Sequence, residues 1–300
     1  MQNNKSILAY LSVIFAMVFW SMSFVWIKIV FESYSPITAT VLRLILSSIM
    51  ILSFGLISRK IQKIHKEDYK WIVLLAFFEP FLYFIGETGG MFYVSSTLGA
   101  VIISTIPMFC PVAEYIFFKE KVKANIYIGI FLSIIGVCVI SMSNNILEGN
   151  SFKGIALLVL AIFSGVGQTL MIRKISARYN ALTIVAMQNS IGTLLFLPIF
   201  FIFEFDKFIT ITPTREVIEA LIYLSFFAST LAFILYTYSI GKLGISKSVV
   251  FCNVIPVFTA IFAYFILGEE ITLTKFIGIG IVIFGLFLSQ KKFKRKSLKF

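Results

Sequence analysis

Four ionisable side chains interrupt long apolar stretches of this sequence: Arg43, Glu79, Glu87 and Glu114. An ionised side chain costs at least about 2.5 to 3.5 kcal/mol at the centre of a membrane-spanning helix, so it normally faces a partner, a cavity or water. Arg43 and Glu87 lie at similar depths when counted from the ends of their apolar stretches. The matching depth predicts an ion pair between them, either a static link between two helices or a pair that breaks during gating.

Glu79 is expected near mid-membrane, on the same helix as Glu87. Eight residues at about 100° each put the two acids only about 80° apart around that helix, with Tyr83 between them. Pro80 removes a backbone donor and can open the helix locally, which exposes a carbonyl group to a ligand. Glu79 could bind a substrate ammonium group or take up a proton, because burial favours the uncharged form of a carboxyl group. The alternative is a hydrogen-bonded Glu with a structural role.

Uncharged polar and aromatic residues could complete a binding cavity. Polar groups often join helices inside membranes, so each is either a structural link or a binding group. Asn253 lies one helical turn before Pro256, as Ser104 lies before Pro107, which makes Asn253 the favoured cavity residue of the second half. The other candidates are Gln168, Gln188 and Asn189 among the amides, and Trp20, Tyr83, Tyr236 and Tyr238 as aromatic walls.

The composition excludes an ordinary water-soluble protein. Of the 300 residues, 59% are hydrophobic and 13% are charged, whereas soluble domains have about 45 to 50% and about 25%. Apolar runs of about 20 residues, the length that crosses a hydrocarbon core of about 30 Å as a helix, recur along the chain. They predict an all-α polytopic membrane protein with ten transmembrane helices, near residues 7–28, 37–58, 71–92, 97–118, 124–143, 153–172, 181–203, 217–239, 246–267 and 273–290.

The basic residues predict how these helices are oriented. If both termini are cytoplasmic, the cytoplasmic segments contain 20 Lys and Arg residues and the opposite face contains five, which is the bias expected of cytoplasmic loops. The net charge of +12 is therefore attributed to topology and not to nucleic-acid binding. The first helix is expected to be retained, because no small-residue cleavage signal follows it. The basic tail, residues 291–300, could also contact anionic membrane lipid.

An internal duplication relates the two halves. A shift of 149 residues lays Pro107 on Pro256, and a shift of 145 residues aligns the first two helices with the sixth and seventh. Because five helices are an odd number, the second half must enter the membrane from the opposite side. The sequence thus predicts two inverted five-helix repeats, an architecture that recurs in secondary transporters and occurs in some channels. The expected domains are residues 1–143, residues 144–290 and the cytoplasmic tail 291–300.

Three segments carry a family resemblance: FWSMSFVWIKIV from Phe19, SPITATVLRLILSS from Ser35 and PVFTAIFAYFILGEEIT from Pro256. Together with the helix count and the duplication, they resemble the EamA family of the drug/metabolite transporter superfamily over residues 7–290. The resemblance implies a carrier in a bacterial cytoplasmic (inner) membrane, with a central cavity between the halves and peripheral fifth and tenth helices. It also implies export of small metabolites such as amino acids.

Individual positions both match and depart from that family. Pro36, Arg43, Pro107 and Pro256 fit its recurring residues, which mostly shape helices and their ends, while Ser21 replaces the glycine of a Trp-Gly pair. The third helix departs most, through its acids Glu79 and Glu87 and through Pro80.

Two other function classes stay open: an intramembrane enzyme and a non-transporting sensory membrane protein. The sole histidine, His65, lies in a basic connector, so no histidine-based metal site or Ser-His-Asp arrangement can form inside the membrane. The cysteines Cys110, Cys138 and Cys252 lack metal-type spacing. We therefore expect no catalysis, no cofactor and no metal. The expected partners are a small-molecule substrate and membrane lipid, with a homodimer as an open alternative. Three modes of transport stay open: coupling to protons through Glu79, exchange and facilitated diffusion.

Overall fold

The computed structural model describes residues 2–119, 124–142 and 150–290, and all its regular elements in these ranges are helical. The C-terminal tail 291–300, for which the sequence predicts a lipid contact, lies outside the described residues, as does the side chain of Glu114. The helices of the first half are α1 (Gln2–Val30), α2 (Pro36–Ile57), η1 (Lys66–Asp68), α3 (Tyr69–Ala76), η2 (Phe77–Leu82), α4 (Tyr83–Met91), α5 (Ser96–Ile103), α6 (Ile106–Phe118) and α7 (Ala124–Met142).

The second half likewise contains long helices and helices that are interrupted by π- or 3₁₀-helical segments. Its elements are α8 (Asn150–Ile175), α9 (Ala181–Phe203), α10 (Phe205–Phe208), α11 (Arg215–Tyr223), η3 (Leu224–Ala232), α12 (Phe233–Leu243), α13 (Ile245–Ser248), η4 (Val249–Val254), α14 (Ile255–Leu267) and α15 (Leu273–Gln290).

Seven helical segments of the described residues are long and apolar enough to cross a membrane. Shorter apolar helices cover 127–140, 251–267 and 273–285, where the sequence predicts further spans. The expected class, an all-α polytopic membrane protein, agrees with this structure. The long segments are Ile7–Val30, Pro36–Ile57, Lys66–Met91, Ser96–Phe117, Ser151–Ile175, Ala181–Phe203 and Arg215–Leu243.

Each half contains interrupted helices among the described residues. The π-helical segments η2 and η3 each lie in the middle of a long span. Within η2, Glu79 leaves the helical conformation, with φ −143° and ψ 122°, directly before Pro80. The helices α6 and α14 each begin next to a proline, Pro107 or Pro256, after a break in the preceding helix. Such interruptions free backbone groups from the helical ladder, which membrane proteins tolerate where protein or a cavity satisfies them.

Local sequence signals set several helix ends. Pro36 occupies the first turn of α2, and the Ser35 side chain accepts a hydrogen bond from the backbone of Thr38. Asn180 caps α9 in the same way through Thr183, at 2.8 Å. These caps satisfy backbone donors that a helix start leaves unpaired.

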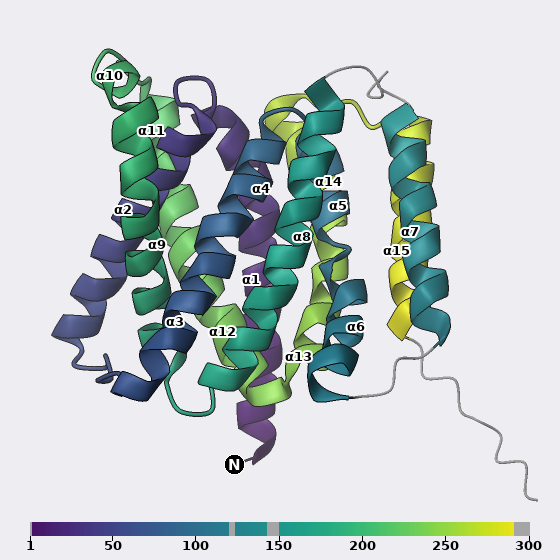
Figure 1. The fold of residues 1–300 in the computed structure, drawn as a ribbon. Coiled ribbons are helices and arrows are strands. Elements are labelled where there is room, and N and C mark those ends of the chain that lie inside the picture. The colour runs from purple at the N-terminus through teal and green to yellow at the C-terminus, as the bar shows by residue number, and fades with distance from the viewer. Residues whose placement is uncertain (1, 120–123, 143–149, 291–300) are drawn as a thin grey trace, which may run out of the picture.

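The helices α7 and α15 stand side by side at one edge of the bundle, as the family resemblance implies (Figure 1). Their backbones approach closely at Gly136 and Gly278: a Cβ atom on Gly136 would lie 2.8 Å from the Gly278 carbonyl oxygen. Small residues permit such close helix packing in membranes. Helix α1 crosses the whole bundle from the N-terminal end (Figure 1) and packs mainly against α12, α14, η3 and α11.

Candidate functional site

A small internal cavity lies between the two halves. Its volume is about 50 Å³, enough for a few water molecules. Helices of both halves line it. The lining residues with polar or aromatic side chains are Trp20, Ser23, Phe24, Arg43, Tyr83, Phe84, Glu87, Gln168, Thr169, Phe233, Tyr236 and Cys252.

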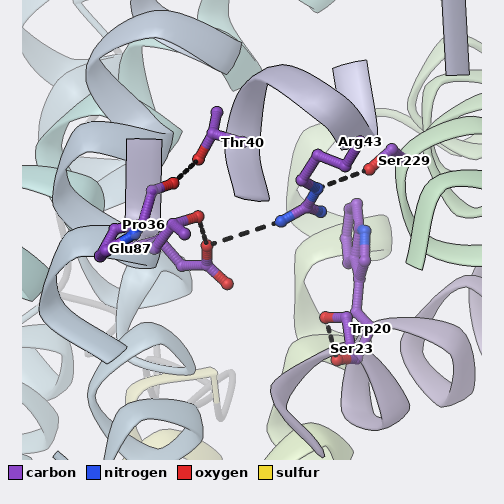
Figure 2. A network of polar contacts seen from close by, with 8 residues as sticks. Trp20, Ser23, Pro36, Thr40, Arg43, Glu87 and Ser229 are labelled. Atoms are coloured by element: carbon purple, nitrogen blue, oxygen red, sulfur yellow. Dashed lines mark hydrogen bonds and ion pairs between the residues drawn. The ribbon is translucent and has the colours of Figure 1, made fainter. Parts of the chain in front are cut away.

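Arg43 and Glu87 form the charged part of the cavity wall (Figure 2). Arg43 Nη1 lies 4.0 Å from Glu87 Oε2, so the predicted ion pair is confirmed. The guanidinium group also lies 4.1 Å from the centre of the Phe84 ring, and Arg43 Nε donates a 2.8 Å hydrogen bond to Ser229 Oγ. Both charged residues are buried, at 3% and 4% exposure. A cation and an anion are thus held side by side facing one cavity.

Polar contacts beyond Arg43 join α2 and α9 to η3. Ser47 Oγ donates to the Ser229 carbonyl oxygen at 3.1 Å. Asn189 Nδ2 donates both to Ser47 Oγ, at 2.7 Å, and to the same Ser229 carbonyl oxygen, at 2.8 Å. The carbonyl of Ser229 is available because η3 is π-helical there. These contacts fix the hydroxyl group that binds Arg43. Sequence reasoning missed Ser229 and Ser47, which lie in apolar segments among many other Ser and Thr residues.

Aromatic rings also line the cavity. Trp20 packs edge-on against Phe233 and Tyr236, with ring centres 5.1 and 4.8 Å apart. Tyr83 also lines the cavity. The cavity therefore combines one charged edge with an aromatic wall, an arrangement that suits a small zwitterion or a cation with an apolar part.

Glu79 lies behind the cavity wall, in contact with both expected glutamines. Its Oε2 atom accepts hydrogen bonds from Gln168 Nε2, at 3.4 Å, and from Gln188 Nε2. Gln168 belongs to α8 and also lines the cavity, whereas Gln188 belongs to α9 and does not. The structure thus brings three sequence candidates into one cluster that joins both halves.

Two glycines of the second half position the π-helical segment that contains Glu79. A Cβ atom on Gly167 would lie 2.7 Å from the Phe78 ring, and one on Gly192 would overlap Pro80. The residues on either side of Glu79 therefore fit into gaps that only glycine leaves on α8 and α9. This fit holds the carboxyl group against Gln168 and Gln188.

Asn253, the favoured cavity residue of the second half, lies beside the cavity but does not line it. It is buried in η4 at 4% exposure, and neither of its side-chain polar atoms has a hydrogen-bond partner among the described residues. Its neighbours Cys252 and Ile255 line the cavity instead. In the 3₁₀ segment η4, residues three apart lie on one face, so Cys252 shares the cavity-facing side with Ile255, whereas Asn253 shares the side of Pro256, which does not line the cavity.

Polar contacts also join the two halves near both ends of the bundle. At one end Glu269, after α14, accepts hydrogen bonds from the backbone of Ser96 at 2.7 Å and from Thr97 Oγ1 at 2.8 Å. At the end of the bundle where the chain starts, Arg178 forms an ion pair with Asp68 at 3.0 Å, and Tyr179 donates a hydrogen bond to the same carboxylate at 2.8 Å. The hydrogen bond and charge of Asp68 hold the pKa of Arg178 above its ordinary value.

Known proteins are similar to this chain in sequence or in fold. The sequence profile described as the EamA-like transporter family matches the chain twice, over residues 7–142 and 152–290. The uncharacterized transporter YetK of Bacillus subtilis (strain 168) is 29% identical over 97% of this chain and 89% of its own length. An uncharacterized transporter of Archaeoglobus fulgidus is 27% identical over 97% of this chain and 99% of its own length. One protein of known crystal structure shares the fold with a TM-score of 0.71 at 13% identity, covering 94% of this chain and 97% of that chain.

Proposed function

Because this chain belongs to the EamA-like transporter family, we propose that it exports a small metabolite, such as an amino acid, by alternating access through the central cavity. The cavity itself carries the proposal: residues of both halves line it, and it holds the buried pair Arg43 and Glu87. Its volume of about 50 Å³ is too small for a metabolite. Rocking of the two halves therefore has to enlarge it during each cycle.

The proposed architecture is ten transmembrane helices in two inverted five-helix repeats. The family profile matches each half separately. The paired interruptions at η2 and η3, and before α6 and α14, support the same division. With inverted repeats, the same rocking motion can close one end of the cavity while it opens the other.

We place both termini in the cytoplasm. The connector 58–65, the connector 176–180 and the turn between α12 and α13 all lie at the end of the bundle where the chain starts (Figure 1). Most described basic residues belong to this end, whereas most described acids belong to the other, and a cytoplasmic position is the one favoured for basic loops. The acids at the other end are Glu32, Glu204, Asp206, Glu216, Glu219, Glu269 and Glu270.

The cavity chemistry supports a zwitterionic substrate. A substrate carboxylate can pair with Arg43 and a substrate ammonium group with Glu87, each replacing part of the ion pair that the two residues form with each other. The rings of Trp20 and Tyr236 can cover an apolar side chain. In this arrangement the pair has to separate for the substrate to bind, which makes it a gating pair.

Counterflow into proteoliposomes loaded with unlabelled amino acids and small metabolites tests this function. Labelled substrate should accumulate in vesicles with the wild-type protein and not in protein-free vesicles. Arg43→Gln should abolish accumulation of carboxylate substrates. Absence of counterflow across the whole pool, with correctly inserted protein, would contradict transport of this class.

A further inference from the structure

Glu79 is a buried acid that the substrate cavity does not use. It is 1% exposed, lies in the middle of the span Lys66–Met91, and is not among the cavity-lining residues. Gln168 lies between the cavity and Glu79, because it lines the cavity and donates a hydrogen bond to Glu79 Oε2. The carboxyl group therefore lies outside the cavity lining, and its role needs an explanation of its own.

The polar groups around Glu79 have one hydrogen-bond donor too few. Gln188 Nε2 donates to Glu79 Oε2, while Glu79 Oε1 and Gln188 Oε1 are both buried and have no hydrogen-bond partner among the described residues. Both orphaned atoms are acceptors when Glu79 is ionised, and they belong to two groups that already share one hydrogen bond. A proton on the carboxyl group supplies the donor that satisfies both.

We infer that Glu79 is a proton-binding site whose protonated form makes a cyclic acid–amide pair with Gln188. In this pair the Glu79 Oε1 hydroxyl donates to Gln188 Oε1, and Gln188 Nε2 donates to Glu79 Oε2. Release of the proton to water leaves a carboxylate with two acceptor oxygens, so the Gln188 carbonyl must turn away from it.

The charges around Glu79 favour the neutral acid. Helix α9 has no ionisable residue, and those of α8 lie at its ends. On the same span, the ionisable residues at the start are Lys66, Glu67, Asp68, Tyr69 and Lys70, and those after Glu79 are Tyr83 and Glu87. Arg43 is the nearby cation among the described residues, and Glu87 already pairs with it. A carboxylate at Glu79 would make two anions share one cation in a buried site, which is costly.

Gln168 links this proton site to the cavity. Its amide group contacts both the cavity and Glu79, so loss of the proton and a change in cavity shape both move the same side chain. This part rests on the proposed function: a proton and a substrate would bind in alternation, and export would be driven by proton entry.

Infrared spectroscopy of the purified full-length protein in lipid vesicles at neutral pH tests the proton site without transport. The wild type should show the carbonyl band of a protonated carboxylic acid, and Glu79→Gln should lose it. Glu87→Gln is the matched control and should keep the band. Glu79→Gln can still form an amide–amide pair with Gln188, so it should fold. A wild-type spectrum without a band that depends on Glu79 would overturn the inference.

A second variant tests the pairing and does not require Glu79 to be replaced. Gln188→Met removes the amide that pairs with the acid while the hydrogen bond from Gln168 stays, so the acid band should move to higher frequency; an unchanged band would overturn the acid–amide pair. In counterflow, Glu79→Gln should remove the dependence of transport on pH, and an unchanged dependence would overturn the coupling. A band that depends on Glu79, in a protein without counterflow, would leave the proton site standing and contradict only the proposed function.

Discussion

Arg43→Gln tests the energetics of the buried charge pair. Two unit charges 4.0 Å apart attract by about 4 kcal/mol at an effective dielectric constant near 20. Truncating one partner of a buried pair typically costs about 3 to 5 kcal/mol, because the other charge stays buried and uncompensated. Arg43→Gln also loses the hydrogen bond to Ser229 and the contact with the Phe84 ring. We expect the free energy of unfolding to fall by about 3 to 5 kcal/mol.

The double variant Arg43→Gln/Glu87→Gln separates charge from packing. It removes both charges, so it should be more stable than Arg43→Gln alone by about 2 to 3 kcal/mol. Equilibrium unfolding in mixed micelles measures all the variants. Arg215→Gln is the control: it breaks an exposed ion pair with Glu219, at 2.6 Å, and should lose less than about 1 kcal/mol.

Two results would refute this reasoning. If Arg43→Gln is no less stable than the Arg215→Gln control, the buried pair contributes nothing. If the double variant is no more stable than Arg43→Gln, the loss comes from packing and hydrogen bonding, and the uncompensated charge of Glu87 is not its cause.

Two further predictions use neighbouring or open positions as controls. Gly192→Ala should lower the thermal unfolding temperature by an amount that corresponds to about 1 to 3 kcal/mol, because the new methyl group overlaps Pro80. A methyl group on the control Gly280→Ala meets nothing within 4 Å, so this variant should leave the unfolding temperature unchanged or raise it. Equal effects of the two variants would contradict the fit of η2 against α9. Glu269→Gln should cost about 1 kcal/mol in the same measurement, because a charged acceptor at the start of α5 is replaced by a neutral one. The exposed Glu270→Gln should change stability by less than about 0.5 kcal/mol, and an equal loss would argue against a specific role of Glu269.

The class of this protein and the Arg43–Glu87 contact were predictable from the sequence. Apolar runs of spanning length have few alternatives, because backbone groups inside a bilayer must be satisfied within a helix. The same constraint makes a buried charge conspicuous, and matching depths suffice to suggest a partner. Depth counting works because the rise of about 1.5 Å per residue depends little on tertiary context.

Which side of a helix faces the cavity was not predictable from spacing alone. Asn253 was expected to line the cavity from its distance to Pro256, but the side that carries these two residues does not line it, and Cys252 and Ile255 line it instead. The interruption at η2 lies at Pro80, where the sequence predicts that the helix opens, whereas η3 contains no proline and its interruption has no counterpart in apolar periodicity.

The clustering of Glu79 with Gln168 and Gln188 was decided by tertiary structure alone. The three residues were separate candidates in the sequence, because residues 89 and 109 positions apart can meet in many ways. They meet because Gly167 and Gly192 leave room for Phe78 and Pro80. A glycine in a sequence indicates that a close approach is allowed, but only the packed structure determines which residue occupies the space.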